Sequence, residues 1–357
     1  MLNILVMAGG RGERFWPKSR IRMPKQLLDL TGRGTMIRET VWRVKALADW
    51  AQIYIITGQD YAEAIREQLP EIPSENIILE PEGRNTAPCI GLAAMVIGTK
   101  DPEGIMAVLA SDHVIDDDAG FCNLLQKGIG VAETTGGIVT LGIRPNRPET
   151  GYGYIKTGQA YREVSGVYHV ERFTEKPDLE TACEFVSTGK YLWNSGIFIW
   201  KNRTILRLIK QYMPDLHQGL QKIRAALGTS DYDTVLKREF GQFEKISIDY
   251  GIMEKASEVY VLPADIGWDD VGSWTSLERI RTRDKAGNII NTPNVSLVDV
   301  KGCIIEASGE KLVAAVGIEN LIYVETPDVV LLCPKHRVQD IKLLLEKLRM
   351  EKRERYL

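Results

Sequence analysis

No segment of this sequence could cross a membrane as a helix, because it contains no run of 18 or more apolar residues. Nor does it begin with the charged and apolar segments of a secretory signal. We therefore expect a cytoplasmic protein that has no membrane partner. The net charge of −3 also argues against non-specific binding to nucleic acid.

Cysteine is scarce as well, and the five cysteines that occur lie far apart. None of them forms a CxxC pair, and their odd number argues against a disulfide framework. We expect them to be the free thiols of a protein in a reducing compartment. They are Cys89, Cys122, Cys183, Cys303 and Cys333.

What the sequence does have is a regular alternation of apolar strands and helices over its first 143 residues. Continuous apolar strands are typical of a parallel sheet that helices cover on both faces. We therefore predict an α/β fold with a Rossmann-like, mixed but mainly parallel sheet. The expected strands are residues 3–7, 52–57, 105–110 and 137–143, and the expected helices are residues 35–48, 59–68, 86–98 and 119–134.

The pattern changes further along the chain. Residues 287–334 contain short β-rich segments at roughly 8–10-residue spacing, which indicates coiled or meandering β structure. A charged helix is expected over residues 336–352. We predict a first domain of residues 1–284 and a second, β-rich domain of residues 285–357. Between residues 144 and 286 we expect strands at 151–157, 167–176 and 193–201 and helices at 178–188 and 203–212.

The segment NILVMAGGRGERFWPKSRIRMPKQLL (3–28) runs from an apolar strand into a glycine-rich turn that is crowded with cations. Such a turn is typical of loops whose backbone N–H groups bind phosphate. A P-loop requires GxxxxGK[ST], and a dinucleotide fingerprint requires GxGxxG with a ribose-binding acid; neither pattern is present. The cations are Arg11, Arg14, Lys18, Arg20, Arg22 and Lys25.

A longer loop that holds a triphosphate accounts for this excess of positive charge. Gly9, Gly10 and Gly12 allow backbone N–H groups to approach phosphate oxygens. Arg14 and Lys25 then supply charge, the arginine as a planar fork and the lysine as a point charge. The alternative is a solvated basic surface loop, against which the buried strand directly before it argues.

The segment ILEPEGRNTAPCIGLAA (78–94) contains residues that suit a nucleotide base. Guanine presents its N1–H and N2–H₂ donors side by side, and a carboxylate such as Glu80 is their natural bidentate acceptor. Asn85 and nearby backbone groups are candidates for reading the rest of the base. The alternative is a loop that leads into a helix capped by Asn85 or Thr86.

The segment VLASDHVI (108–115) places polar residues at the end of an apolar strand. Ser111 and Asp112 therefore stand at the carboxyl edge of the predicted sheet, where open α/β sheets bind ligands. An acid in this position suits a Mg²⁺ ion that carries nucleotide phosphates, since Mg²⁺ needs only one or two protein carboxylates. The alternative is an aspartate that caps a helix.

Together these motifs resemble those of the sugar-1-phosphate nucleotidylyltransferases, in the form of the mannose-1-phosphate guanylyltransferase branch. MAGGRGERFWPKSRIRMPKQLL matches GGxGxRxxPxS/T…PKxxL, and EP…GRNTAP, GYGYI, FTEKP, WNSGIF and ADIGWDDVGSW follow in the expected order. The resemblance covers residues 3–275. It implies transfer of GMP from GTP to α-D-mannose 1-phosphate, giving GDP-mannose and pyrophosphate, with Mg²⁺ as cofactor.

The resemblance also implies roles for individual residues. Arg14, Lys25, Asp112 and Lys176 would carry the catalysis, and Asp112 and Asp270 would bind the metal. Lys176 would hold the phosphate of the sugar phosphate. The implied nucleotide-binding residues are Ala8, Gly9, Gly10, Gly12, Arg14, Lys25, Glu80, Asn85, Thr86 and Ser111, and the implied sugar-phosphate-binding residues are Gly153, Glu175, Lys176, Asn194 and Gly196.

Two of these assignments stay open. Asp269 stands next to Asp270, so either can be the second metal ligand, and Asp265 is a further candidate. Asp249, in SIDYGIMEK (247–255), also matches the guanylyl branch, but it can equally cap the helix that follows.

The function has open alternatives too. One is the same chemistry with another sugar 1-phosphate and nucleoside triphosphate, and another is a non-catalytic homologue that binds nucleotide sugars. An NAD-dependent oxidoreductase is a third. In this family the β-rich tail often forms a left-handed β-helix with oligomer contacts, so we expect a homodimer. Longer members add an isomerase domain beyond this point, and we expect no isomerase activity from a sequence that ends at Leu357.

Overall fold

The structure is a computed structural model that describes residues 1–10 and 12–357, so Arg11 of the basic loop lies outside the described residues. The described residues form two compact units, each assembled from separate stretches of the chain. The domain boundary near residue 284 stays a prediction. Unit 1 comprises Met1–Gly9, Thr40–Ser111 and Ile115–Trp268, and unit 2 comprises Gly10–Glu39, Asp112–Val114 and Asp269–Leu357.

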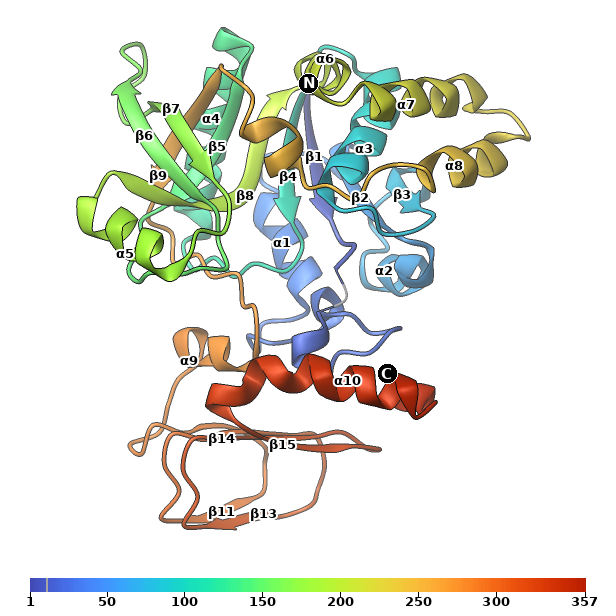
Figure 1. Cartoon of the computed structure of the whole chain (residues 1–357). Helices are drawn as coiled ribbons and strands as arrows, with labels where there is room; N and C mark the ends of the chain where they lie inside the picture. Colours follow the sequence, from blue (N-terminus) through green and yellow to red (C-terminus); the bar gives the residue numbers. More distant parts are fainter. Residues whose placement is uncertain (11) are drawn as a thin grey trace. The chain divides into compact units, whose positions relative to one another are not determined.

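Unit 1 is built on a mixed sheet, which confirms the predicted α/β class (Figure 1). Its described strands follow the order β3-β2-β1-β4-β8-β5-β9-β7-β6. The part from β3 to β4 is parallel, whereas β8 is antiparallel to both β4 and β5. The strands are β1 (Leu2–Met7), β2 (Ile53–Gly58), β3 (Ile77–Glu80), β4 (Ile105–Ala110), β5 (Ile138–Ile143), β6 (Tyr154–Ala160), β7 (Tyr168–Thr174), β8 (Tyr191–Lys201) and β9 (Val259–Ala264).

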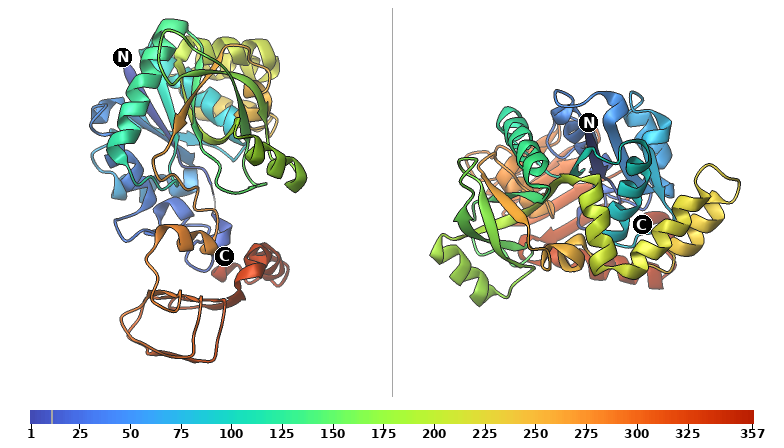
Figure 2. Two further views of the ribbon diagram at one scale, coloured as in Figure 1. Left: turned by 90° about the vertical axis from the view of Figure 1, so that its left-hand side faces the viewer. Right: turned by 90° about the horizontal axis from the view of Figure 1, so that it is seen from above.

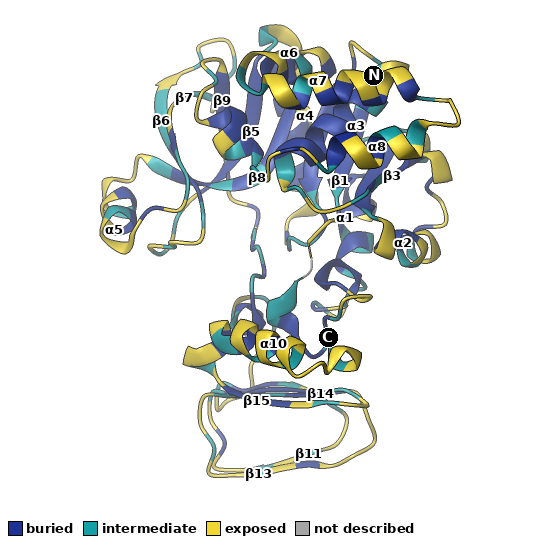
Figure 3. Ribbon diagram, turned by 45° about the vertical axis from the view of Figure 1, so that its right-hand side comes forward, coloured by how far each residue is buried: buried dark blue, intermediate teal, exposed yellow. Residues whose placement is uncertain are grey.

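Helices cover both faces of this sheet. Helices α3, α6, α7 and α8 share one apolar cluster with sheet residues such as Leu5 and Val108, and α4 packs on β4, β5 and β8 from the opposite face (Figure 2). Strands β1, β2, β4 and β5 are therefore almost fully buried (Figure 3), which explains why they read as continuous apolar runs. The helices of unit 1 are α2 (Ala62–Gln68), α3 (Thr86–Lys100), α4 (Asp118–Thr135), α5 (Leu179–Thr188), α6 (Asn202–Tyr212), α7 (Pro214–Ala226) and α8 (Tyr232–Phe240).

Some elements of unit 1 have no counterpart among the predicted ones, namely β3, α7, α8 and β9. Strand β9 contains Pro263, and proline usually argues against a central strand because it lacks an N–H donor. The strand nevertheless lies between β5 and β7. The predicted strand over 151–157 also begins later, at Tyr154, so that Gly153 stands in the turn before β6.

Unit 2 contains a coil of short strands, as the β-rich tail predicted (Figure 1). Strands β10, β12 and β14 pair in parallel as successive rungs, β15 joins β14 in antiparallel, and β11 and β13 form a second parallel pair. Apolar side chains such as Cys303 and Ile305 pack inside the coil. The strands are β10 (Ile289–Asn291), β11 (Val295–Val298), β12 (Ile304–Ala307), β13 (Val313–Val316), β14 (Leu321–Glu325) and β15 (Val330–Pro334).

The helices of unit 2 are shorter than predicted. The expected helix over 336–352 is a 3₁₀ segment, Lys335–Asp340, followed by α10 (Ile341–Met350), and α9 (Leu277–Ile280) precedes the coil. The chain passes from unit 2 to unit 1 within α1 (Met36–Val44). Among the described residues, no helix is both long and apolar enough to span a membrane.

The basic opening loop belongs to unit 2, and several of its side chains bond to the coil or to the chain that follows it. Phe15 and Trp16 are buried in one cluster with residues of the coil and of α10. Lys18 Nζ lies 2.5 Å from Glu306 Oε2, which is buried on β12. Arg20 bonds to Asp328 at 2.8 Å. Lys18 and Arg20 are thus occupied by contacts within the protein.

A pair of glycine substitutions tests the packing of unit 1. In Gly219→Ala, the new Cβ would lie 2.2 Å from Cε1 of Phe243, so either the buried phenyl ring or α7 has to shift. We expect a loss of about 1–3 kcal/mol in the free energy of unfolding. Gly130→Ala is the control, because nothing lies within 4 Å of its Cβ and alanine favours a helix by about 1 kcal/mol. Urea denaturation followed by circular dichroism measures both, and equal stability of the two variants would contradict this account.

Candidate functional site

The residues predicted to bind phosphate and metal belong mainly to unit 2, where Lys25 ties together three segments that lie far apart in the sequence. Its ammonium donates to Asp112 O at 2.8 Å, to Asp112 Oδ2 at 2.9 Å and to Asp270 O at 2.6 Å. All three N–H donors of the ammonium are therefore used, and the residue is only 4% exposed. The lysine fixes the loop to both segments that carry the predicted metal ligands.

Gly12 allows the loop to lie directly on this lysine. Its φ of 61° is in the left-handed region, which favours glycine. A Cβ at this position would also lie 2.2 Å from the Cβ of Lys25, a distance that real structures do not tolerate. Any larger residue would therefore displace both the loop and Lys25.

A cavity of about 440 Å³ opens beside these residues, and its lining includes Arg14, Lys25, Asp112 and Asp270. Nε of Arg14 is buried and has no hydrogen-bond partner among the described residues, while Nη1 lies 3.5 Å from the oxygen of Gly272. A guanidinium with unused donors beside a cavity suits an anionic ligand.

The two carboxylates at this cavity fit a Mg²⁺ ion. Mg²⁺ usually takes one or two protein carboxylates and completes its octahedron with water and substrate phosphates. Among residues 1–10 and 12–357, no three His, Cys, Asp or Glu side chains gather as a metal-binding group, so a metal here would depend on its substrate for further ligands. Burial alone would raise the pKa of Asp112, but Lys25 and His113 outweigh it and lower this pKa. The carboxylate is therefore ionised at neutral pH.

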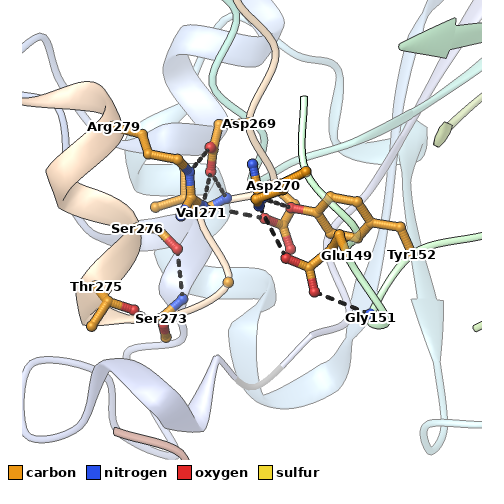
Figure 4. Close-up of polar contacts among 12 residues, drawn as sticks. Glu149, Gly151, Tyr152, Asp269, Asp270, Val271, Ser273, Thr275, Ser276 and Arg279 are labelled. Carbon is orange, nitrogen blue, oxygen red and sulfur yellow. Dashed lines mark hydrogen bonds and ion pairs between the residues drawn. The ribbon is translucent and has the colours of Figure 1, made fainter. Parts of the chain in front are cut away.

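The geometry separates Asp269 from Asp270. Asp269 is buried and its carboxylate bonds to Arg279, with Oδ1 2.8 Å from Nη2, and it also accepts the N–H of Val271 at 2.8 Å (Figure 4). Asp270 instead lines the cavity. Asp265 belongs to unit 1, is exposed, and does not line this cavity. The structure therefore favours Asp270 as the second ligand.

Val271, directly after Asp270, has an unusual backbone. Its φ is 46°, which is strained for a β-branched residue, and its side chain is fully buried. Such strain is found at ligand sites, where the surrounding packing maintains it. Here the buried side chain and the hydrogen bond from its N–H to Asp269 hold the turn that presents Asp270.

The residues predicted to bind the base belong to unit 1, and Glu80 at the end of β3 is the central one. The residue is 5% exposed, and burial raises its pKa to about 7, while a hydrogen bond with Cys89 acts in the opposite direction. A Cβ on Gly9 would lie 3.2 Å from Glu80 Oε2, so the glycine makes room for this carboxyl group. A carboxyl group balanced near pH 7 becomes ionised readily when a ligand donates two hydrogen bonds to it.

Asn85 and Thr86 form the start of α3. Asn85 Oδ1 accepts the N–H of Thr86 at 2.8 Å, and Thr86 Oγ1 accepts the N–H of Ile248 at 2.8 Å. In this structure Asn85 therefore acts as the helix cap that the sequence left as an alternative. The backbone of Asn85, with φ of 68° and ψ of −177°, falls in a region that is nearly exclusive to glycine. The turn that leads from Glu80 to α3 is therefore strained at this residue.

Ala8 and Ser111 act through their backbones. Ala8 N donates to Ile56 O at 2.8 Å, and Ser111 N donates to Met7 O at 3.1 Å. Both residues are buried just beyond the carboxyl ends of the neighbouring parallel strands β1 and β4. In the sequence, Gly10 follows two residues after Ala8, and Asp112 follows directly after Ser111.

The residues predicted to bind the sugar phosphate also belong to unit 1. Glu175 and Lys176 follow β7, with Glu175 Oε1 2.6 Å from Lys176 Nζ. Glu175 Oε2 is buried and has no hydrogen-bond partner in the described part of the chain. A Cβ on Gly153 would lie 2.4 Å from this oxygen. A buried acceptor beside glycine backbone suits a ligand hydroxyl, because an unpaired buried oxygen is costly.

Asn194 connects this group to Asp249, which the sequence supported only weakly. Asn194 Nδ2 donates to Asp249 Oδ1 at 2.9 Å, and its Oδ1 accepts the N–H of Gly196 at 3.1 Å, where φ is 69°. Burial and the charge of Glu175 raise the pKa of Asp249 to about 6, while Lys176 and Asn194 lower it. The structure thus brings Asp249 into the group of Glu175, Lys176 and Asn194.

Sequence reasoning missed the support of the turn that contains Gly153. Arg147 lies over the ring of Trp193, 4.9 Å from its centroid, and over that of Tyr152 at 5.9 Å. The carbonyl of Tyr152 accepts the N–H of Lys176 at 3.2 Å, and Glu149 accepts the N–H of Gly151 at 3.1 Å (Figure 4). The signal was present in the run RPETGYGY, in which an arginine and an acid directly precede the glycines.

Family models and curated relatives match nearly the whole of this chain. The model of the nucleotidyl transferase family matches residues 3–286, and that of the mannoseP isomerase/GMP-like beta-helix domain matches residues 293–348. A mannose-1-phosphate guanylyltransferase of Klebsiella pneumoniae is 39% identical over 100% of this chain and 76% of its own length. One from Escherichia coli K12 is 38% identical over 98% of this chain and 74% of its own.

A solved structure has the same fold over nearly the whole chain. It comes from Thermus thermophilus, is described as a mannose-1-phosphate geranyltransferase, and is 34% identical with a TM-score of 0.87. The match covers 98% of this chain and 99% of that one. Since both the sequence and the fold agree over almost all residues, the chain belongs to the mannose-1-phosphate guanylyltransferases of the nucleotidyl transferase family.

Proposed function

We propose that this protein transfers GMP from GTP to α-D-mannose 1-phosphate, with GDP-mannose and pyrophosphate as products. The observation that carries the proposal is the cavity of unit 2, where Asp112 and Asp270 stand beside Arg14 and the buried Lys25. The named relatives support the choice of substrates. We further propose that the protein is a cytoplasmic homodimer.

The chemistry needs little acid–base help from the protein. The phosphate of mannose 1-phosphate is already an anion, so one of its oxygens can attack the α-phosphorus of GTP without a general base. That bond forms while the bond to the α,β-bridging oxygen breaks, and its electrons leave with pyrophosphate. The barrier is electrostatic, because one anion approaches another, so catalysis consists of positioning and charge stabilisation.

The residues of unit 2 would act on the triphosphate. Arg14 has free donors for the β- and γ-phosphates, and backbone N–H groups at Gly10 and Gly12 add to them. Lys25 contributes its charge and fixes the two aspartates, since its own donors are used within the protein. Asp112 and Asp270 would hold Mg²⁺, which supplies charge neutralisation on the phosphates when it is bound.

The residues of unit 1 would choose the base and the sugar. Glu80 would accept the N1–H and N2–H₂ donors of guanine, with Asn85 and Thr86 shaping the adjoining turn. Lys176 would hold the sugar phosphate in line, because its side chain is 58% exposed and its ammonium has further N–H donors beyond the one directed at Glu175. Glu175 Oε2 and the backbone at Gly153 and Gly196 would form hydrogen bonds with sugar hydroxyls. Asn194 would orient these hydroxyls.

An assay of pyrophosphate release tests the proposal directly. It would combine the four nucleoside triphosphates with a panel of sugar 1-phosphates in the presence of Mg²⁺. We expect GTP with mannose 1-phosphate to be turned over fastest. Faster turnover of another pair would overturn the proposed substrates, and no turnover with any pair would favour the non-catalytic alternative.

Substitution of Lys25 and Asp112 tests the phosphate site. We expect Lys25→Ala and Asp112→Ala each to lower kcat by at least about 100-fold, the scale of losing one preorganised electrostatic contact. Arg22→Ala is the control, because Arg22 is an exposed cation of the same loop that does not line the cavity. Near-normal turnover of either test variant would refute the role given to that residue.

The raised pKa of Glu80 predicts how GTP binding depends on pH. Below about pH 7 the carboxyl group is mainly protonated in the free protein, and guanine binding has to remove that proton. We therefore expect affinity for GTP to fall about tenfold from pH 8 to pH 6, with proton release on binding near pH 7. Calorimetry in buffers of different ionisation enthalpy measures both quantities.

Two variants sharpen this pH experiment. Glu80→Gln should bind GTP more weakly and lose the proton release, because an amide does not titrate and its NH₂ group replaces one of the two acceptor oxygens. Glu82→Gln, at an exposed position in the same loop, should keep the pH dependence of the original protein. A pH profile that survives in Glu80→Gln would mean that another group reads the base.

A further inference from the structure

The cavity of unit 2 has one lining residue from the far end of the sequence, Lys342, which is the second residue of α10. The side chain is exposed and makes no hydrogen bond or ion pair with any other described residue. We infer that Lys342 binds the terminal phosphates of GTP and the pyrophosphate that leaves. The identity of the phosphate donor rests on the proposed function, whereas the binding of a polyphosphate does not.

The charges of the opening loop show why another cation matters. Lys18 and Arg20 are engaged with Glu306 and Asp328, so they are not available to a ligand. The ammonium of Lys25 has its donors on Asp112 and Asp270. Among Arg14, Lys18, Arg20 and Lys25, only Arg14 both lines the cavity and has an unused N–H donor. A triphosphate carries more negative charge than one guanidinium balances, and Lys342 supplies the next cation.

The contacts of α10 with the opening loop fix the position of Lys342. Ile341 and Leu345 are buried in the cluster that contains Phe15 and Trp16 of the loop. Further along the helix, Arg349 Nη2 lies 2.6 Å from Glu13 Oε1. The helix is thus fixed to the loop on both sides of the cavity residue. The flexible side chain of Lys342 can then bring its compact positive charge to a phosphate.

The position of Lys342 also indicates which phosphates it meets. It shares the cavity with Gly12 and Arg14, the residues proposed for the β- and γ-phosphates. GDP-mannose lacks the pyrophosphate that leaves, so a contact to the terminal phosphates is absent from the product complex. Loss of Lys342 should therefore weaken binding of GTP and pyrophosphate while binding of GDP-mannose stays the same.

Binding of inorganic tripolyphosphate to the full chain tests this inference without any turnover. In calorimetry with Mg²⁺ we expect Lys342→Met to raise the Kd for tripolyphosphate about tenfold, the scale of one charge-assisted hydrogen bond, and Lys342→Arg to restore most of the affinity. Lys347→Met is the matched control, since Lys347 lies on the same helix, pairs with Glu351 and does not line the cavity. An unchanged Kd in Lys342→Met would overturn the inference.

Kinetics of the reverse reaction separate binding from loss of structure. Lys342→Met should raise the KM for pyrophosphate and leave the KM for GDP-mannose unchanged, with the same melting temperature as Lys347→Met. A parallel rise in both KM values would mean that the variant disturbs the unit as a whole, and it would contradict the inference. If the protein transfers no nucleotide at all, the proposed function fails, and the tripolyphosphate titration still decides the role of Lys342.

Discussion

The arrangement of unit 2 depends on one buried ammonium. Lys25 is almost fully removed from water, and an unpaired charge in that position would be very costly. Its hydrogen bonds to Asp112 and to the carbonyl of Asp270 remove this cost and at the same time join three distant segments. Gly12 is required because the loop lies directly on the lysine. The same interaction therefore fixes the glycine-rich loop and positions both acidic residues.

The sheet of unit 1 brings together strands that are distant in the sequence. Strands β1 and β4 are parallel neighbours, paired from Leu2 with Ile105 to Met7 with Ala110. Their carboxyl ends lie at one edge, and there the chain continues into the glycine loop and into Asp112. Parallel strands always deliver their following loops to the same edge, which is why open α/β sheets bind ligands there. Lys25 and Asp112 themselves lie 87 residues apart in the sequence and meet within unit 2.

The sequence predicted the types of residue at the site better than their partners. Apolar runs and glycine-rich turns indicated the sheet and its loops, because such patterns depend on local burial and backbone freedom. The sequence singled out Arg14 and Lys25 among the six cations of the loop but gave no partner for the others, and the structure shows Lys18 and Arg20 bonded to Glu306 and Asp328. The sequence assigned the second ligand to Asp270 and left Asp269 as an alternative. In the structure Asp269 Oδ1 lies 2.8 Å from Arg279 Nη2, whereas Asp270 is 4.0 Å from this arginine and lines the cavity. Charge is visible in a sequence, but the identity of the partner is not.

The sequence by itself determined the α/β class and the family of the protein, because strand pattern, glycine spacing and motif order are local properties. Only the tertiary structure decided that the lysine donors are used internally and that Asp249 joins the sugar group. It also decided that α10 brings Lys342 to the cavity lined by Arg14, Asp112 and Asp270. These features arise from contacts between segments that are distant in sequence, and the packing of the strands, the coil and α10 alone brings such segments together.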